Sequence, residues 1–248
     1  KHIHGRPAAG VMKVNGGANA GHTAAGLKLN LLPSGVGDPD VETLLIGSGV
    51  VADPRKFLWE AKPLEKRGLQ VISRLLIDQK CQMSDLSHRL LDLALENYRV
   101  NQLGMESRGS TGRGISPAYG DETGQWQIYY QSFLEDKEAF SLALKQRCQR
   151  ALDTIRWVCK VQESDWYDFF ENLSSAETRA NDASIQDGIF PSDEFDFKRF
   201  MGNDPFSLNL EELTEVYWDA GKELQDCIKD GRDFLLRSAQ KKRLVVAE

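Results

Sequence analysis

Long apolar stretches are missing from this chain of 248 residues. No run approaches the roughly 20 consecutive apolar residues that a membrane-spanning helix requires, and the first residues lack the basic and then apolar order of a secretory signal. The sequence therefore predicts no membrane partner and no export. Its content of 41% hydrophobic and 27% charged residues is instead typical of a globular protein.

Basic residues are too few to dominate the surface. The chain has 31 lysines and arginines against 37 aspartates and glutamates, which gives a formal net charge of -6. A dedicated nucleic-acid binder needs a basic face that displaces counterions from phosphates. We therefore expect no nucleic-acid partner, whereas a small anionic ligand needs only local positive charge.

Cysteine is also scarce. The chain has four cysteines, Cys81, Cys148, Cys159 and Cys227, and no two of them are spaced as Cys-x-x-Cys. This pattern argues against a zinc site and against a disulfide framework. A reducing, cytoplasmic location fits it best.

Residues 1–132 show the pattern of an α/β nucleotide-binding core, in which short apolar runs alternate with glycine turns. The runs typical of strands are Val11–Val14, Leu27–Leu32, Thr43–Ile46 and Val71–Ile77. A helix is expected to begin after Asp53, with Pro54 at its first position, and to end at Gly68. The order strand, helix, strand predicts a mostly parallel central sheet with crossover helices.

Helical spacing of apolar residues dominates from residue 133 onward. We expect a helical subdomain over residues 133–240, with a polar surface insertion near 174–206, and a last strand over 241–248 that returns to the sheet. A helix is also expected after Ser84. His88 lies off its apolar stripe, which favours a surface or cap role.

The first glycine-rich stretch, Asn15–Thr23, directly follows a predicted strand and has three glycines among nine residues. Glycine allows the backbone to approach a ligand, so that successive N–H groups can point at phosphate oxygens. Asn19 offers an amide, His22 a group that titrates near neutrality and Thr23 a hydroxyl. The alternative is a plain turn, because glycine-rich loops are common.

The second glycine-rich stretch, Gly109–Gly114, combines a flexible backbone with two hydroxyl groups and the guanidinium of Arg113. These groups suit a phosphate or a nucleotide. Taken alone the signal is weak, because serine, threonine and glycine occur in any exposed loop.

Several segments together resemble, in order and spacing, those of the adenylosuccinate synthetase family. Asn15–Thr23 resembles its loop ending in Asn-Ala-Gly-His-Thr, and Leu31–Gly35 resembles the strand end that follows. Ile46–Pro54 resembles the next turn and helix start, and Gly109–Tyr119 the nucleotide loop. Val245–Glu248 resembles the strand that leads into the family's Glu-Gly-Ala-Gln-Gly motif.

The resemblance implies an α/β fold like that of P-loop NTPase-like nucleotide ligases, and a homodimer that joins L-aspartate to IMP with GTP as co-substrate and Mg²⁺ as cofactor. His22 would be the general acid. IMP would be bound by Asn19, Ala20, Gly21, His22 and Thr111, GTP by Gly21, His22 and Thr23, and magnesium by the carbonyl of Gly21.

The sequence also departs from the family pattern. It contains no Gly-Asp-Glu-Gly-Lys-Gly loop, which carries a catalytic aspartate and a phosphate-binding lysine in the family, so these 248 residues alone are expected to be inactive. Gln125 stands where the family has an arginine that crosses the dimer to the IMP phosphate, and Arg113 or Arg108 could replace that charge. Two alternatives therefore stay open: an inactive nucleotide-binding module, or a synthetase for another purine monophosphate such as dGMP.

Overall fold

The computed structural model describes residues 2–3, 6–7, 9–19, 21–24, 26–232 and 244–247. The chain divides into two compact units. The sheet unit contains Lys1–Ser84, Gln127–Lys137 and Asp219–Glu248, and the helical unit contains Asp85–Trp126 and Glu138–Trp218. This grouping differs from the expected boundary at residue 132, because residues 85–126 pack with the later helices.

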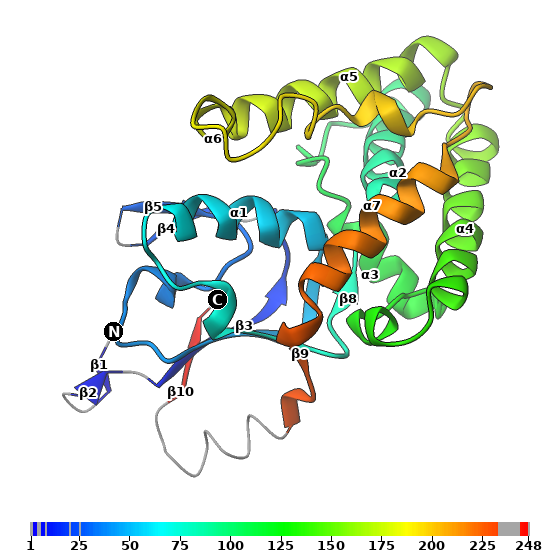
Figure 1. Ribbon diagram of the computed structural model, residues 1–248. Coiled ribbons are helices and arrows are strands. Elements are labelled where there is room, and N and C mark those ends of the chain that lie inside the picture. The colour runs from blue at the N-terminus through cyan, green and yellow to red at the C-terminus, as the bar shows by residue number, and fades with distance from the viewer. Residues whose placement is uncertain are drawn as a thin grey trace. The chain divides into compact units, whose positions relative to one another are not determined.

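The sheet unit is built on a parallel sheet (Figure 1). The strands are β1 (His2–Ile3), β2 (Arg6–Pro7), β3 (Gly10–Gly16), β4 (His22–Ala24), β5 (Leu27–Leu29), β6 (Thr43–Ala52), β7 (Leu75–Asp78), β8 (Gln82–Met83), β9 (Ile228–Lys229) and β10 (Leu244–Ala247). The main sheet has the order β10-β3-β6-β7-β9, with β8 beside β6, and all of its pairs are parallel. The predicted mostly parallel α/β sheet is therefore confirmed. Of the strand expected over 241–248, residues 244–247 are described and form β10.

Helix α1 (Pro54–Lys66) connects β6 to β7 and follows one face of the sheet (Figure 1). It begins as predicted, because the Asp53 side chain accepts a hydrogen bond from the backbone N–H of Arg55 and proline occupies the first helical position. Its apolar side chains Phe57, Ala61 and Leu64 are buried. The chain leaves the helix at Gly68, which has a φ of +85°.

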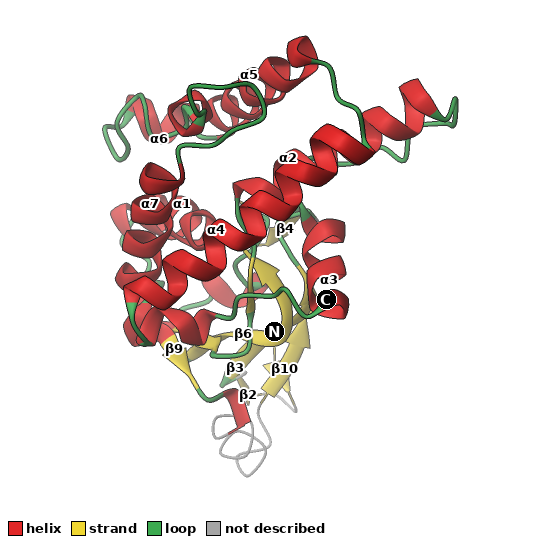
Figure 2. Ribbon diagram, turned by 90° about the vertical axis from the view of Figure 1, so that its right-hand side faces the viewer, coloured by secondary structure: helices red, strands yellow, loops and turns green. Residues whose placement is uncertain are grey.

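The described part of the helical unit consists of helices and connecting turns (Figure 2). The helices are α2 (Leu86–Asn97), η3 (Tyr98–Gln102), α3 (Ile115–Gly124), α4 (Lys137–Asp153), η5 (Thr154–Val158), α5 (Glu163–Ala180), α6 (Asp182–Gln186), η6 (Phe197–Phe200) and α7 (Leu210–Glu223), with α4 and α7 each crossing a boundary between the units. Trp166, Phe170 and Leu173 of α5 are buried at helical spacing.

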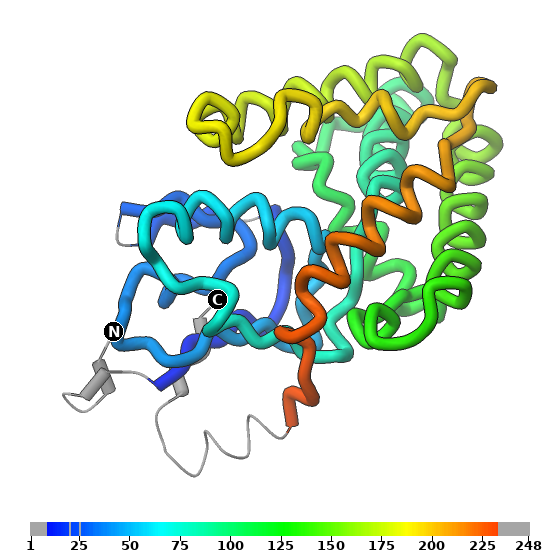
Figure 3. Tube along the Cα trace, viewed as in Figure 1, coloured from blue at the N-terminus to red at the C-terminus, as the bar shows by residue number. Residues whose placement is uncertain are grey.

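The segment 174–206, expected as a polar surface insertion, is partly helical and partly packed. Helix α5 continues to Ala180, and its Ser174 and Glu177 are buried. After α6 the chain turns back along α5 (Figure 3), where the Ser174 hydroxyl accepts a hydrogen bond of 2.9 Å from the backbone N–H of Phe197. Four phenylalanines of this polar segment are also buried, namely Phe190, Phe195, Phe197 and Phe200. These few aromatic side chains bury enough apolar area to order the segment despite its polar composition.

All four cysteines are buried and none forms a disulfide, as the spacing predicted. Burial raises the pKa of the thiols of Cys159 and Cys227 to about 11, so these two groups stay protonated and chemically inert near neutral pH. Among the residues that the structure describes, no helix has both the length and the apolarity that crossing a membrane requires.

Candidate functional site

The first glycine-rich stretch begins where β3 ends. The register of β3 against β6 shifts between Lys13 and Asn15, and a Cβ atom added to Gly49 of β6 would lie 2.5 Å from the carbonyl oxygen of Val14. The strands therefore approach too closely for a side chain at Gly49. At the end of β3, Gly16 has a φ of +70°, which turns the chain out of the sheet.

Asn19 stabilises this turn. Its side-chain Oδ1 accepts a hydrogen bond of 3.3 Å from the backbone N–H of Gly17, which leaves the NH₂ group as the donor available to a ligand. Asn19 is exposed, so its amide is accessible to a ligand. Ala20, which the resemblance also assigns to the IMP site, lies outside the described residues.

His22 and Thr23 lie on the strand β4, which pairs antiparallel with β5 so that His22 faces Leu29 and Thr23 faces Lys28. Gly21 and Thr23 are exposed and His22 is half-buried. Because successive side chains of a strand point to opposite sides, the imidazole and the Thr23 hydroxyl face different directions. A small ligand on one side of the strand therefore reaches the side chain of only one of these two residues, and it contacts the other through that residue's backbone.

Glu60 of α1 fixes the chain that leaves this hairpin. Its carboxylate accepts hydrogen bonds of 3.0 to 3.3 Å from the backbone N–H groups of Asn30, Leu31 and Leu32. The Nζ of Lys56 lies 3.7 Å from the same carboxylate, and both side chains are only 8% exposed. Three backbone donors on one buried carboxylate hold the hairpin against α1.

Lys13 of β3 connects this arrangement to the sheet. Its Nζ donates a hydrogen bond of 3.0 Å to the carbonyl of Asn30. Burial lowers the pKa of Lys13, and the nearby charge of Glu60 opposes that shift. Lys13, Lys56 and Glu60 therefore form a buried charged cluster that connects the sheet, α1 and the hairpin.

Replacing Glu60 with glutamine is expected to lower the free energy of unfolding by about 2–3 kcal/mol. The amide keeps one acceptor oxygen but loses the charge that serves three N–H groups and two lysines. Urea denaturation measures the change, with Glu42→Gln as the control, because Glu42 is exposed on the same unit. Equal stability of the two variants would show that the carboxylate does not hold the hairpin.

The second glycine-rich stretch has an outer and an inner side. Ser110 and Thr111 are exposed, whereas Gly112 and Gly114 are buried. Gly114 has a φ of +72°, and its added Cβ atom would lie 2.7 Å from the carbonyl carbon of His88. The loop therefore presents its hydroxyl groups to solvent while its glycines pack against α2.

One face of α2 supports this loop. The Arg89 Nε donates to the Gly112 carbonyl (2.9 Å), the Asp92 carboxylate accepts from the Gly114 N–H (3.1 Å), and the Glu96 carboxylate accepts from the N–H groups of Arg108 (2.7 Å) and Gly109 (3.2 Å). Residues three and four apart on a helix lie on the same face. The spacing of Arg89, Asp92 and Glu96 is the sequence signal that could have predicted this support.

Arg113 points to the inner side of the loop. Its guanidinium pairs with Glu177 of α5, which is 0% exposed and also lies 3.1 Å from Arg89 Nη1. Glu177 therefore holds Arg113 inward in this structure, and the replacement of the family's arginine by Arg113 or Arg108 stays a prediction. Gln125, at that position, is exposed and has a φ of +61° at the end of α3.

His88 is a buried cap rather than a surface residue. Its Nδ1 accepts from the backbone N–H of Asp85 at 3.1 Å, so Nε2 carries the proton toward Asp121 at 3.0 Å. Burial alone would raise the pKa of the carboxyl groups of Asp85 and Asp121, but Arg147 and His88 at Asp85, and His88 and Arg150 at Asp121, outweigh it and lower both. Both carboxylates therefore stabilise the folded state above their unfolded pKa of about 3.9 and lose that contribution in acid.

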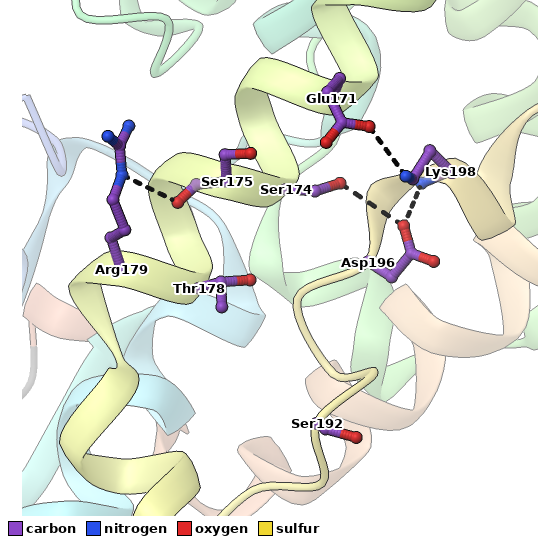
Figure 4. A pocket seen from close by; sticks show the side chains of 8 residues that line it. All are labelled: Glu171, Ser174, Ser175, Thr178, Arg179, Ser192, Asp196 and Lys198. Atoms are coloured by element: carbon purple, nitrogen blue, oxygen red, sulfur yellow. Dashed lines mark hydrogen bonds and ion pairs between the residues drawn. The ribbon is translucent and has the colours of Figure 1, made fainter.

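An open pocket of about 480 Å³ lies along α5 in the helical unit (Figure 4). Its wall contains Glu171, Ser174, Ser175, Thr178, Arg179, Ser192, Asp196 and Lys198. Lys198 pairs with Glu171 at 2.8 Å, and Arg179 donates to the carbonyl of Ser175 at 3.2 Å. None of the residues that the sequence singled out as a site lines this pocket.

The predicted site residues thus fall into two groups. Asn19, Gly21, His22 and Thr23 follow one another in the sheet unit, and Thr111 belongs to the helical unit. Within the described residues, no three His, Cys, Asp or Glu side chains are grouped so that they could hold a metal ion.

Comparison with known proteins points to one family. A sequence model of adenylosuccinate synthetase matches residues 3–190. Curated relatives named adenylosuccinate synthetase include those of Polaromonas naphthalenivorans (strain CJ2), 40% identical over 141 residues, and Haemophilus influenzae (strain PittGG), 42% identical over 139 residues. These alignments cover 55% and 54% of this chain and 31% of each relative's length, so the match spans less than a third of those proteins.

A solved structure of fully ligated adenylosuccinate synthetase from Plasmodium falciparum has a similar fold. It superposes with a TM-score of 0.67 at 18% identity, over 96% of this chain and 45% of that one. At this identity the likeness concerns the fold alone. Because the sequence model covers most of the chain and the fold agrees, the chain belongs to the adenylosuccinate synthetase family.

Proposed function

We propose that this chain takes part in the GTP-dependent ligation of L-aspartate to IMP, which gives adenylosuccinate, GDP and phosphate. The observation that carries the proposal is the exposed amide of Asn19 in the turn after β3, together with the half-buried imidazole of His22 on the β4–β5 hairpin, which Glu60 holds. This arrangement supports a ligand site at the end of a parallel strand, where α/β proteins usually place one.

The chemistry proceeds in two steps. The 6-oxygen of IMP attacks the γ-phosphorus of GTP while the N1 proton passes to the catalytic aspartate of the family's Gly-Asp-Glu-Gly-Lys-Gly loop, which these 248 residues do not contain. The bond from the γ-phosphorus to the bridging oxygen breaks, and GDP leaves. The deprotonated amine of aspartate then attacks C6 and displaces the new phosphate, and the excess proton on the nitrogen passes to solvent. His22 acts as the general acid by stabilising charge on the oxygens that change bonds.

Binding roles follow the same proposal. Asn19, Ala20, Gly21 and His22 contact IMP, and Thr111 donates its exposed hydroxyl to the IMP phosphate. Gly21, His22 and Thr23 contact GTP. The exposure of Asn19, Gly21, Thr23 and Thr111 supports these assignments.

The residues present offer few ligands for magnesium, so they fit an ion that is bound mainly through the nucleotide. The Gly21 carbonyl is a hard oxygen ligand of the kind that Mg²⁺ prefers, and phosphate oxygens and water would complete its shell. When bound, the ion would neutralise charge on the phosphates of GTP.

The proposal is tested by following adenylosuccinate by chromatography in mixtures that lack one substrate at a time. A catalytically active form of the protein must need IMP, GTP and aspartate together, and product formed without GTP would contradict the proposal. We propose that the 248 residues alone bind nucleotide without completing the reaction, because the sequence holds no Gly-Asp-Glu-Gly-Lys-Gly element.

Replacing Gln125 with arginine is expected to strengthen IMP binding about ten- to a hundredfold, because a guanidinium adds a charge-assisted bond to the phosphate. The proposal assumes a homodimer in which residue 125 reaches the partner's ligand. Gln125 is exposed, so the larger side chain disturbs no packing. Calorimetric titration at fixed ionic strength measures the change.

The matched control is Thr123→Arg, which makes the same change of charge at an exposed position in the last turn of α3. An equal gain in both variants would indicate general electrostatic attraction. No gain in Gln125→Arg would show that this residue does not face the phosphate.

A further inference from the structure

Glu177 is a fully buried carboxylate in the helical unit, and it serves the second glycine-rich loop. It lies in the last turns of α5, 64 residues beyond Arg113, with which it forms an ion pair. Arg113 is itself only 20% exposed in its side chain. A charge this deeply buried requires a partner of opposite sign, so the pair fixes the direction of the Arg113 side chain.

Arg89 connects the same carboxylate to the loop by a second route. Its Nη1 lies 3.1 Å from Glu177, and its Nε donates to the carbonyl of Gly112 at 2.9 Å. The guanidinium also stacks over the ring of Phe197, 5.0 Å from its centroid. Glu177 is thus the counter-charge for two arginines, one in the loop and one that holds the loop backbone.

The loop also packs closely between α2 and α5. A Cβ atom added to Gly112 would meet Leu93 of α2 at 3.2 Å and Leu173 of α5 at 4.0 Å. Leu173 and Glu177 are four residues apart and therefore project from the same face of α5. Helix α5 consequently contacts the loop with one apolar and one charged side chain, while Thr111 on the other side of the loop remains exposed.

We propose that Glu177 is a positioning residue for nucleotide binding: it holds Arg113 and Arg89 inward and thereby sets the backbone from which Thr111 meets the IMP phosphate. The inference rests on the proposed function of this loop. Without the carboxylate, two guanidinium groups repel each other in a buried site, so Arg113 turns outward and the loop loses its attachment to α5. Binding of a ligand must then order the loop, and the unfavourable free energy of ordering reduces the affinity.

The test compares Glu177→Gln, which keeps the shape of the side chain, with Glu171→Gln. Glu171 is on the same helix and its ion pair with Lys198 is exposed, which makes it a matched control. Titration with IMP is expected to show about tenfold or greater weakening for Glu177→Gln and no change for Glu171→Gln. Both variants are measured well below their melting temperatures, so that only folded protein is compared.

Two further measurements separate positioning from a general loss of structure. Amide hydrogen exchange of residues 108–114 without ligand is expected to be at least about tenfold faster in Glu177→Gln and unchanged in Glu171→Gln. Adding Arg113→Met to Glu177→Gln is expected to weaken IMP binding no further, because loss of the carboxylate has already removed the ion pair through which Arg113 holds the loop.

The outcomes distinguish this inference from the proposed function. If Thr111→Ala weakens IMP binding and Glu177→Gln does not, or if Glu177→Gln strengthens it by releasing Arg113 to the ligand, the inference is overturned and the loop's role stands. If Thr111→Ala leaves IMP binding unchanged, the loop's role in the proposed function fails. In that case hydrogen exchange of residues 108–114 still decides whether Glu177 fixes the backbone of the loop. Unchanged exchange in Glu177→Gln would overturn the inference as well.

Discussion

Replacing His22 with alanine is expected to lower turnover on the order of 100- to 10,000-fold in a catalytically active form of the protein, which is a much larger effect than the loss of IMP affinity from the missing imidazole contact. A general acid stabilises charge that develops only in the transition state, so its loss affects kcat far more than ground-state binding. Single-turnover kinetics and an IMP titration on the same variant separate the two effects.

The geometry of the hairpin supports this split between turnover and binding. His22 lies on β4 opposite Leu29, and the strand is fixed through Glu60 and the chain at residues 30–32 rather than through the imidazole. Truncating a half-buried imidazole at this position therefore leaves the backbone in place. The control is Lys28→Ala, an exposed change on the paired strand, which should leave both quantities unaltered.

Normal turnover combined with weak IMP binding would reverse the assignment. His22 would then be a binding residue, and the glycine-rich stretch would be a turn that holds it. Loss of both quantities together with a lower melting temperature would show instead that the imidazole supports the hairpin.

Local signals in the sequence predicted the sheet unit well. The Asp53–Pro54 start and the Gly68 end of α1 depend on neighbouring residues only, and capping chemistry fixes them without tertiary context. The first glycine-rich turn follows from the same logic, because Gly16 takes a positive φ that other residues avoid.

The two carboxylates that hold the loops from distant parts of the chain, Glu60 and Glu177, could not be predicted from the sequence pattern. Glu60 lies 28 to 30 residues from the N–H groups that it binds, and Glu177 lies 64 residues from Arg113. In the sequence of a helix, neither glutamate can be distinguished from the other acidic residues. Only the fold brings these carboxylates to their partners, which is why the buried charges of the helical unit were not predicted.

The segment after α5 shows a different limit. Its serines, asparagines and aspartates indicate a loop when composition is averaged, but Phe195, Phe197 and Phe200 are each at most 2% exposed. A few large aromatic side chains bury as much area as many small ones. Composition alone therefore underestimated how much of this segment is packed.

Replacing Gly114 with alanine is expected to lower the free energy of unfolding by about 3–5 kcal/mol, through two effects that add at one position. The φ of +72° lies in the left-handed region, which costs about 1–3 kcal/mol for a residue with a side chain. The new Cβ atom would also lie 2.7 Å from the carbonyl carbon of His88 and 2.8 Å from the backbone nitrogen of Arg89. Backbone atoms of a helix cannot turn aside as a side chain can, so the loop itself must move.

Such a movement would break the hydrogen bond from the Gly114 N–H to Asp92 and shift Thr111, so IMP binding should weaken along with stability. Gly120→Ala is the matched control, because Gly120 lies within α3 with no atom within 4 Å of its added Cβ. That variant should gain up to about 1 kcal/mol from the better helix propensity of alanine. Urea denaturation of both variants measures the difference. If Gly114→Ala were as stable as Gly120→Ala, the loop would not pack against the start of α2, and the face of α2 could not be what holds Thr111 outward.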